Sequence, residues 1–224
     1  MAFLIREPRL SDAEAARLRV GGRHVDFEQG KILTFEDSRS DRVFLLTRGV
    51  VKISSVSAGG ALKLLAIRGS GQLVGEFGCI DGGPRSGTTV AVTRGSAWEI
   101  PADRFLHTLR SDAAICFAVM QIIVGRVRES DGRIGEYGEF SAADRVVRLL
   151  ARLGASCAAD VVDGAVVVPV DQAELAGCAG VARETVSRTI TTLARAGVAH
   201  GRRGRVVIDD LPALIRRAQQ TDEG

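Results

Sequence analysis

The first hundred residues alternate short apolar runs with turn-forming residues. A short helix is expected at 13–18, after the cap-like pair Ser11 and Asp12. Between about residues 25 and 100, four apolar or alternating runs are separated by glycine-containing breaks, and these runs are 43–46, 50–53, 62–67 and 88–92. Short, evenly spaced strands with turn signals between them are typical of a barrel, roll or sandwich. This part of the chain therefore predicts a β-structure of that kind.

The apolar period changes after residue 113. From there to about residue 135, apolar residues recur at steps of three and four, at Phe117, Met120, Val124, Val127 and Ile134. This is the spacing of a coiled-coil seam, which predicts a long helix that pairs with a second copy of the chain. A single amphipathic helix packed on its own domain would show the same pattern, so that alternative stays open.

The end of this helix is expected to be weak. Asp131 stands where the seam requires an apolar residue, and glycines follow at Gly132, Gly135 and Gly138. Each glycine weakens a helix by up to about 1 kcal/mol. We expect a marginal helix end that a bound ligand orders, followed by a hinge at 137–141.

Beyond the hinge, the pattern predicts a helix and two hairpins. Ser141 is a good N-cap for a helix that Gly154 should end. Valines on both sides of Asp163 and Gly164 predict one hairpin. The arginine-rich segment 202–205, together with the apolar run that follows it, predicts the second half of a wing hairpin.

Residues 171–195 have the pattern of a helix-turn-helix. Asp171 should cap a short helix, Gly180 should supply a tight turn, and a second helix should run over 182–195. The inward face of this second helix carries apolar residues at i, i+4 and i+7: Val186, Ile190 and Leu193. Its outward face carries Arg183, Glu184, Ser187 and Arg188. In such motifs the second helix enters the major groove, with its N-terminal residues at the base edges.

The outward-facing residues suit a half-site that contains G·C pairs. Arginine can bond guanine O6 and N7, and glutamate can accept from cytosine N4. The alternative is that Glu184 and Arg188 form only a solvated i, i+4 ion pair. Residues 183–205 hold six arginines and a single acid, in a chain whose net charge is only +3. A basic patch beside a helical motif is typical of proteins that bind the phosphate backbone.

The amino-acid composition limits the classes of protein to which this chain could belong. The chain has 224 residues, 46% hydrophobic and 25% charged, which suits one large or two small globular domains. The absence of a long apolar run and of a secretory signal predicts a cytoplasmic protein with no membrane partner. The cysteines are far apart, at Cys79, Cys116, Cys157 and Cys178, and the three histidines are isolated. This spacing argues against a metal, haem or iron–sulfur site and against a cupin-like enzyme.

One segment resembles a known recognition motif. Ala176, Gly180, Arg183, Glu184 and Arg188, at their spacing, resemble the DNA-recognition motif of the cyclic-AMP receptor protein/FNR (CRP/FNR) family of bacterial transcription regulators. The resemblance implies a winged helix-turn-helix, a homodimer on a palindromic DNA site with TGTGA-like half-sites, and RNA polymerase as a partner. It implies base contacts from the recognition helix and phosphate contacts from two wing arginines, Arg202 and Arg203.

The resemblance extends upstream. Gly75, Glu76, Phe77 and Gly78, followed by 84–88, resemble the phosphate-binding cassette of cyclic-nucleotide-binding domains. Arg85 could pair with a cyclic phosphate through its planar fork. Ser86 could donate its hydroxyl, and backbone N–H groups around Gly87 could add donors. Glu76 could accept from a ribose 2′-OH and also orient Arg85. The alternative is that Glu76 and Arg85 form a structural ion pair.

The family's adenine contacts come from the long helix, where Arg126, Ser130 and Asp131 occupy the matching positions. Asp131 departs from the hydroxyl residue that is familiar there. It could accept a hydrogen from adenine N6, although two such side chains near a dimer axis would repel each other. Gly87 is a second departure, because alanine is usual at that position.

Together these observations predict an α+β chain with three parts. Residues 1–110 should form a jelly-roll-like β-roll sensor, 111–138 a dimerisation helix, and 139–220 a winged helix-turn-helix. The expected function is sequence-specific DNA binding by a dimeric, non-enzymatic transcription regulator, controlled by cyclic AMP as effector. The alternative is a regulator of the same fold that responds to a different effector or binds DNA constitutively.

Overall fold

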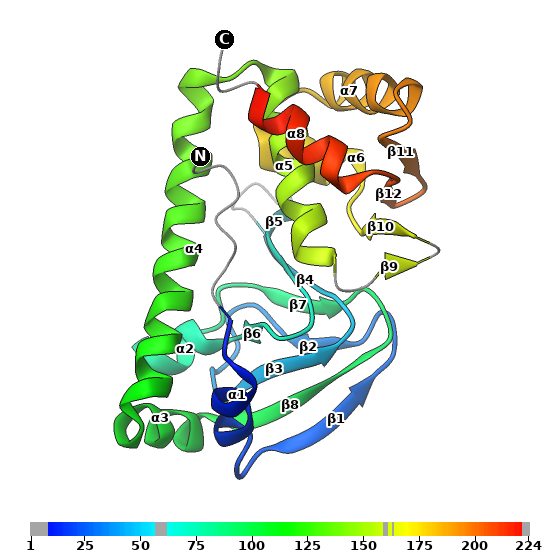
Figure 1. Ribbon diagram of the computed structural model, residues 1–224. Helices are drawn as coiled ribbons and strands as arrows, with labels where there is room; N and C mark the ends of the chain where they lie inside the picture. Colours follow the sequence, from blue (N-terminus) through cyan, green and yellow to red (C-terminus); the bar gives the residue numbers. More distant parts are fainter. Residues whose placement is uncertain (1–8, 57–61, 159–160, 163, 221–224) are drawn as a thin grey trace. The chain divides into compact units, whose positions relative to one another are not determined.

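The computed structural model describes residues 9–56, 62–158, 161–162 and 164–220, and its elements are labelled in Figure 1. The described residues up to Arg128 pack mainly into one compact unit, and those from Glu129 onward pack into a second. The mixture of antiparallel sheets and helices confirms the predicted α+β class.

The first unit is built on two four-stranded antiparallel sheets. One sheet has the order β1-β8-β3-β6 and the other β2-β7-β4-β5. The strands are β1 (Arg23–Phe27), β2 (Ile32–Thr34), β3 (Arg42–Arg48), β4 (Val51–Val56), β5 (Leu62–Arg68), β6 (Leu73–Val74), β7 (Thr88–Ala91) and β8 (Gly95–Pro101). The apolar runs expected to be strands therefore fall in β3, β4, β5 and β7.

Strand β3 explains why its sequence is apolar without alternation. Val43 and Leu45 point into a core shared with Phe105 and other residues of the flanking helices. Phe44 and Leu46 point the other way, into a second core. Because both faces of the strand are covered, both sets of side chains are apolar.

Four helices accompany these sheets in the chain. They are α1 (Asp12–Leu18), α2 (Glu76–Asp81), α3 (Ala102–Ser111) and α4 (Ala113–Glu139). Helix α1 begins at the predicted cap, where Ser11 and Glu14 form a capping box. Among the described residues no single helix is long and apolar enough to cross a membrane, and the bent pair of α3 and α4 passes that test by length and composition only.

Helix α4 is continuous through its three glycines. The sequence suggested a marginal end here, and each glycine does lower the intrinsic helix propensity. A tertiary contact opposes that loss, because the buried Glu136 in the last turns is held by two arginines of the next helix.

The second unit contains α5 (Ala142–Cys157), β9 (Val161–Val162), β10 (Ala165–Val168), α6 (Gln172–Ala179), α7 (Arg183–Arg195), β11 (Ala199–Arg202), β12 (Arg205–Ile208) and α8 (Leu211–Gln220). Its sheet has the order β11-β12-β10-β9. Both predicted hairpins are present, since β9 pairs with β10 and β11 pairs with β12, both antiparallel.

The prediction that Gly154 ends the helix after Ser141 is wrong. Ser141 caps α5 as expected, with its hydroxyl accepting from Asp144 N, but α5 continues to Cys157. A Cβ added at Gly154 would lie 2.6 Å from Cδ1 of Ile208 and 2.9 Å from Cδ1 of Leu211. This glycine therefore permits close packing of α5 and does not terminate it.

Candidate effector and DNA-binding sites

The cassette residues begin at a tight turn before α2. Gly75 is the N-cap of α2 and has φ +84°, a left-handed conformation that favours glycine. Glu76, the first residue of α2, is 1% exposed, and Arg85 beyond the helix is 4% exposed. Burial of two charged side chains without partners would be costly, so their contacts define what the site can bind.

Arg85 is held by backbone carbonyls. Its Nη1 donates to the Gly75 carbonyl oxygen at 3.0 Å, and its Nη2 donates to the Arg42 carbonyl oxygen at 2.5 Å. Burial lowers the pKa of the Arg85 guanidinium from its ordinary value, because desolvation disfavours the charged form. The Nε atom of Arg85 is buried and has no hydrogen-bond partner among the described residues. The guanidinium is therefore fixed in place and still has a donor to offer.

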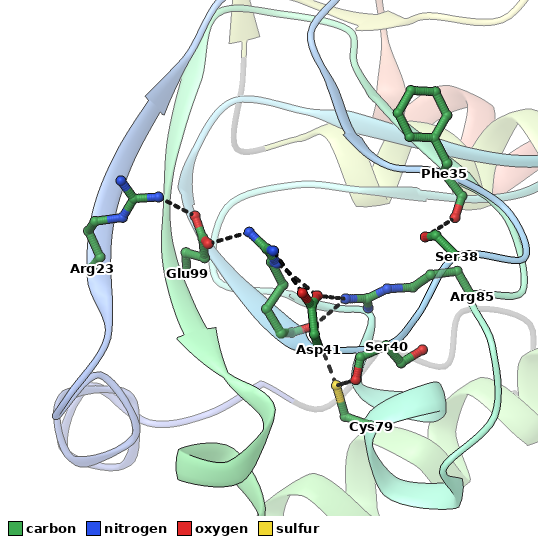
Figure 2. A network of polar contacts seen from close by, with 9 residues as sticks. Arg23, Phe35, Ser38, Ser40, Asp41, Cys79, Arg85 and Glu99 are labelled. Atoms are coloured by element: carbon green, nitrogen blue, oxygen red, sulfur yellow. Dashed lines mark hydrogen bonds and ion pairs between the residues drawn. The ribbon is translucent and has the colours of Figure 1, made fainter.

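A chain of ion pairs lies beside Arg85 (Figure 2). Asp41 is 3.9 Å from Arg85 Nη2 but only 2.8 Å from Arg42 Nη2. Arg42 also pairs with Glu99 at 2.6 Å, and Glu99 pairs with Arg23 at 3.0 Å. The hydrogen bond from Arg42 holds the pKa of Asp41 below its ordinary value. Asp41 is therefore ionised and is mainly neutralised by Arg42 rather than by Arg85.

Glu76 is engaged by the long helix. Its Oε1 pairs with Arg126 Nη1, and Arg126 Nη2 donates to the Leu73 carbonyl oxygen at 2.8 Å. The guanidinium of Arg126 also lies over the Phe77 ring, 5.7 Å from its centroid. The expectation that Glu76 orients Arg85, or pairs with it, is wrong, because Arg126 takes Glu76 and backbone carbonyls take Arg85. The second carboxylate oxygen, Oε2, is buried without a partner in the described part of the chain.

Only some of the hydrogen-bond donors in the turn around Arg85 are available to a ligand. The N–H of Arg85 donates to the Ser38 carbonyl oxygen at 2.9 Å, so this donor is already used. Ser86 is exposed, and Gly87 is buried. A Cβ at Gly87 would lie 2.8 Å from the Ser54 carbonyl oxygen, which explains why glycine stands where alanine is usual.

The remaining effector candidates lie on α4. Ser130 is one turn beyond Arg126, and both Ser130 and Asp131 are exposed. Four seam residues of α4 are also about half exposed within the single chain: Phe117, Met120, Val124 and Val127. The side chain of Ile134 lies outside the described part of the structure.

The unpartnered buried atoms fit a cyclic nucleotide. Arg85 Nε is a donor of positive character, which a cyclic phosphate would satisfy, and Glu76 Oε2 is an acceptor, which a ribose hydroxyl would satisfy. Within the described residues there is no group of three or more His, Cys, Asp or Glu that could hold a metal ion. The four cysteines are free thiols.

The DNA-binding candidates are arranged as a helix-turn-helix. Asp171 and Glu174 form a capping box at α6, and Gly180 ends that helix in the left-handed conformation. Val186, Ile190 and Leu193 of α7 are buried, as predicted. The outward set is exposed on the same helix: Arg183, Glu184, Ser187 and Arg188.

The expected alternative for Glu184 and Arg188 is not seen. Arg188 Nε lies 3.4 Å from the backbone carbonyl oxygen of Glu184, and no ion pair joins the two side chains in the residues that the structure describes. Both side chains are therefore available to a ligand.

The wing flanks a groove beside the start of α7. In the β11–β12 hairpin the backbone of Arg202 lies opposite that of Arg205. The side chains of Arg202 and Arg203 are exposed at its tip. A groove of about 370 Å³ lies between the wing and the helix-turn-helix, with lining residues that include Asp171, Gln172, Arg183, Arg202, Arg203 and Arg205. Arg202 Nε donates to His200 Nε2 at 3.3 Å, and His200 Nδ1 lies 2.8 Å from Asp209.

Sequence reasoning missed several residues that shape these sites. Asp41 and the carbonyl of Arg42 reach Arg85 from more than 40 positions away, and no local pattern marks them. Arg145 was also missed, although it bonds the carbonyl oxygens of Phe140, Ala179 and Gly180. The one sequence signal for this network is the adjacent pair of opposite charges at Asp41 and Arg42, which could have predicted their ion pair.

Two family models match the chain. A cyclic nucleotide-binding domain matches residues 24–112, and a Crp-like helix-turn-helix domain matches residues 144–217. Together with the relatives below, the two models indicate a transcription regulator rather than an enzyme.

Three similar proteins illustrate the range of relatives. The chain is 27% identical to a CRP-like cAMP-activated global transcriptional regulator of Mycobacterium tuberculosis, covering 87% of this chain and 88% of the relative. It is 28% identical to a cyclic AMP receptor protein of Thermus thermophilus, covering 77% of each. The c-di-GMP-responsive global regulator CLP of Xanthomonas campestris shares the fold, with a TM-score of 0.68, 22% identity, and coverage of 88% of this chain and 99% of that one.

The two domain matches span the cassette and the helix-turn-helix described above. The chain belongs to the CRP/FNR family, as a DNA-binding transcription regulator with a cyclic-nucleotide-binding domain.

Proposed function

We propose that this regulator is a homodimer whose affinity for DNA is controlled by cyclic AMP. The observation that carries the proposal is the pair of unpartnered buried atoms in the cassette, Arg85 Nε and Glu76 Oε2. A buried donor and a buried acceptor each cost free energy when left unpaired. A ligand that brings both an anion and a hydroxyl removes both costs, and a cyclic nucleotide has that combination.

Arg126 connects such a ligand to α4. Arg126 is a residue of α4 that pairs with Glu76 and donates to the Leu73 carbonyl oxygen. A ligand hydroxyl bound to Glu76 would therefore share this carboxylate with a side chain of α4. Ser130, one turn further along α4, and its neighbour Asp131 are the residues proposed to read the base. Through these contacts the ligand would favour one arrangement of α4 over others, as a population shift requires.

The DNA side of the proposal rests on α7 and the wing. Arg183, Glu184, Ser187 and Arg188 would meet base edges of a TGTGA-like half-site, and Arg202 and Arg203 would meet phosphates. In a dimer, two recognition helices would enter successive major grooves about 34 Å apart. The exposed seam of α4 would supply the dimer contact.

A different effector is the second candidate, and Asp131 is the observation that favours it. A carboxylate at this exposed position accepts hydrogen bonds but cannot donate them. It would suit adenine N6 and would equally suit another base or a cationic group. The relatives include a c-di-GMP-responsive regulator as well as cAMP-activated ones.

Isothermal titration of the full-length protein tests the effector. Cyclic AMP should bind saturably at one site per chain, and cyclic GMP and c-di-GMP should bind more weakly. Arg85→Ala should abolish binding, and Arg85→Lys, which keeps the charge but loses the fork, should weaken it strongly. Ser86→Ala should retain weakened binding and serves as a folded control in the same turn. No saturable heat with cyclic AMP would contradict the proposed effector.

A further inference from the structure

The wing hairpin carries polar side chains on one of its two faces. His200 and Arg202 of β11 share this face, because side chains alternate along a strand and these residues are two positions apart. Gly201, between them, belongs to the other face, where an added Cβ would lie 3.5 Å from Cγ2 of Ile190 in α7. The recognition helix therefore packs against the face that His200 and Arg202 do not occupy.

Two contacts link three polar side chains of the wing. Nδ1 of His200 lies 2.8 Å from Oδ2 of Asp209, and Nε of Arg202 donates to Nε2 of His200 at 3.3 Å. The backbone fixes Asp209 at the base of the hairpin, because its N–H donates to the carbonyl oxygen of the buried Val198 at 2.9 Å. A carboxylate at the base of the wing is thus connected through an imidazole to an arginine at the tip.

The two contacts specify the protonation state of the imidazole. A guanidinium only donates hydrogen bonds, so Nε2 of His200 must offer its lone pair to Arg202. An ionised carboxylate only accepts, so Nδ1 of His200 must carry a hydrogen and donate it to Asp209. The neutral imidazole with its hydrogen on Nδ1 satisfies both contacts. In the protonated ring both nitrogens are donors, and the N–H at Nε2 would face the N–H of Arg202.

The other charged groups near this face have different partners or positions. On β12, Arg205 lies across from Arg202, and the paired part of β10 beyond it consists of valines. Asp210, the neighbouring acid in the sequence, caps α8, because its carboxylate accepts from the N–H of Ala213 at 2.8 Å. Among the described residues, the imidazole of His200 therefore contacts one carboxylate and shares its face with two guanidiniums.

Arg202 keeps most of its hydrogen-bond donors for a ligand. Its Nε donates to His200, while neither of its Nη groups bonds another described residue. Its side chain also lines the groove of about 370 Å³ beside the start of α7, together with Arg183, Arg203 and Arg205. A guanidinium held through Nε presents its two Nη groups together, and this pair can bind a phosphate in bidentate fashion.

From these contacts we infer that His200 and Asp209 are positioning residues of the wing, which hold Arg202 in the orientation that meets a DNA phosphate. Only the neutral imidazole can do so. The inference rests on the proposed phosphate contact of Arg202 and makes that contact dependent on pH. Histidine side chains change charge between about pH 5 and 8. Protonation of His200 would therefore release Arg202 at a pH where the arginine itself stays charged.

The first test compares two arginines of the wing at about pH 8 and about pH 5.5. The probe is non-specific duplex DNA at low salt, because phosphate contacts dominate this binding and neither an effector nor an operator is needed. In the full-length protein, Arg202→Ala should weaken binding about fivefold at the higher pH and less than about twofold at the lower. Arg203→Ala removes the same charge from the same hairpin tip and should cost the same factor at both. Each factor is a ratio to the unmodified protein, which cancels the general effect of a charged imidazole.

Two substitutions of His200 test whether the imidazole is responsible. His200→Leu removes the acceptor, so Arg202→Ala should cost less than about twofold in this background at either pH. His200→Gln keeps an acceptor that does not titrate, so Arg202→Ala should there cost equal factors at both.

The outcomes separate the inference from the proposed function. A loss from Arg202→Ala that is independent of pH in the otherwise unmodified protein, or undiminished in His200→Leu, would overturn the inference and leave the phosphate contact standing. No loss at either pH would contradict the phosphate contact and the inference together.

Nitrogen NMR of the imidazoles tests Asp209 without DNA. The chain has three histidines, so the signals of His200 are those lost in His200→Gln. At about pH 8 its ring should carry the hydrogen on Nδ1. Asp209→Ala should increase the fraction with hydrogen on Nε2, whereas Asp210→Asn, which removes the same charge but keeps a capping side chain, should not. Hydrogen on Nε2 in the unmodified protein, or no change in Asp209→Ala, would overturn the inference.

Discussion

At the scale of single residues, the cassette and the recognition helix use arginine in two different ways. Arg85 is buried and oriented by backbone carbonyls, which suits a fixed anion. Arg183 is exposed at the start of α7, which suits a base edge that arrives with the DNA. The arginine of the cassette is therefore held in a fixed orientation before a ligand binds, whereas the arginine of the recognition helix can adjust to the DNA.

Arg183→Ala should weaken specific DNA binding by about 1–3 kcal/mol, and the loss should be confined to one base-pair position of each half-site. The physical reason is the loss of a bidentate contact to guanine. Competition binding with a set of singly substituted half-sites measures this. Arg195→Ala removes the same charge from the far end of α7 and should weaken all sites equally and slightly. Equal losses at every base for Arg183→Ala would show that it contacts phosphate only.

Gly87→Ala should destabilise the first unit, although alanine is the usual residue of the family. The added Cβ would lie 2.8 Å from the Ser54 carbonyl oxygen and 3.0 Å from Leu65 Cδ1. Overpacking of this kind costs about 1–3 kcal/mol. Chemical denaturation measures the loss, and Gly138→Ala, which adds the same methyl group in open space, is the control. A stability equal to that of the unmodified protein would mean that β4 and β5 shift to accommodate the added methyl group at little cost in free energy.

At the scale of elements, the sequence predicted the features that depend on residues close together in the chain. The caps at Ser11, Ser141 and Asp171 and the inward face of α7 were all predicted, because a cap or a helical stripe involves residues three or four positions apart. Gly154 was misread because its neighbours Ile208 and Leu211 are about 50 residues away. The pairing of Glu76 with Arg126 was missed for the same reason.

The buried cluster of Glu136 gives the second unit a sensitivity to acid. Burial acts to raise the pKa of Glu136, but hydrogen bonds from Arg152 and Arg148 outweigh it and hold the pKa below its ordinary value. A carboxyl with a lowered folded-state pKa stabilises the fold above its unfolded-state pKa, which is about 4.3. That contribution is lost as the pH falls through the folded-state value.

Glu136→Gln should therefore lower the free energy of unfolding by about 3 kcal/mol near neutral pH, because it leaves two arginines without their carboxylate. The difference from the unmodified protein should shrink as the pH falls below about 4. Urea denaturation at a series of pH values measures both. A difference that is independent of pH would show that the carboxylate contributes packing and no charge interaction.

At the scale of the whole molecule, the proposed binding to a palindromic DNA site requires two copies of the chain. Phe117, Met120, Val124 and Val127 are each 49–59% exposed, and they follow one another along a single face of α4. Apolar side chains at this spacing are typical of a helix that packs against a partner helix. The seam residues were predicted from the sequence, but their partner was not observable in one chain.

Val124→Asp should convert the proposed dimer to a monomer at micromolar concentration, because it places two carboxylates in the apolar seam. Val124→Ile, which keeps the apolar character, should leave the dimer intact. Sedimentation velocity distinguishes the two outcomes. A dimer that survives Val124→Asp would show that another surface holds the two copies together.

The most direct test of the account is the affinity of the full-length protein for a TGTGA palindrome, measured by anisotropy with and without saturating cyclic AMP at one salt concentration. Coupling between two sites is typically worth about 5–150-fold in affinity. We expect the complex to tighten within that range on addition of cyclic AMP, and Arg85→Ala to remove the change. Equal affinities with and without cyclic AMP would contradict control of DNA binding by this nucleotide.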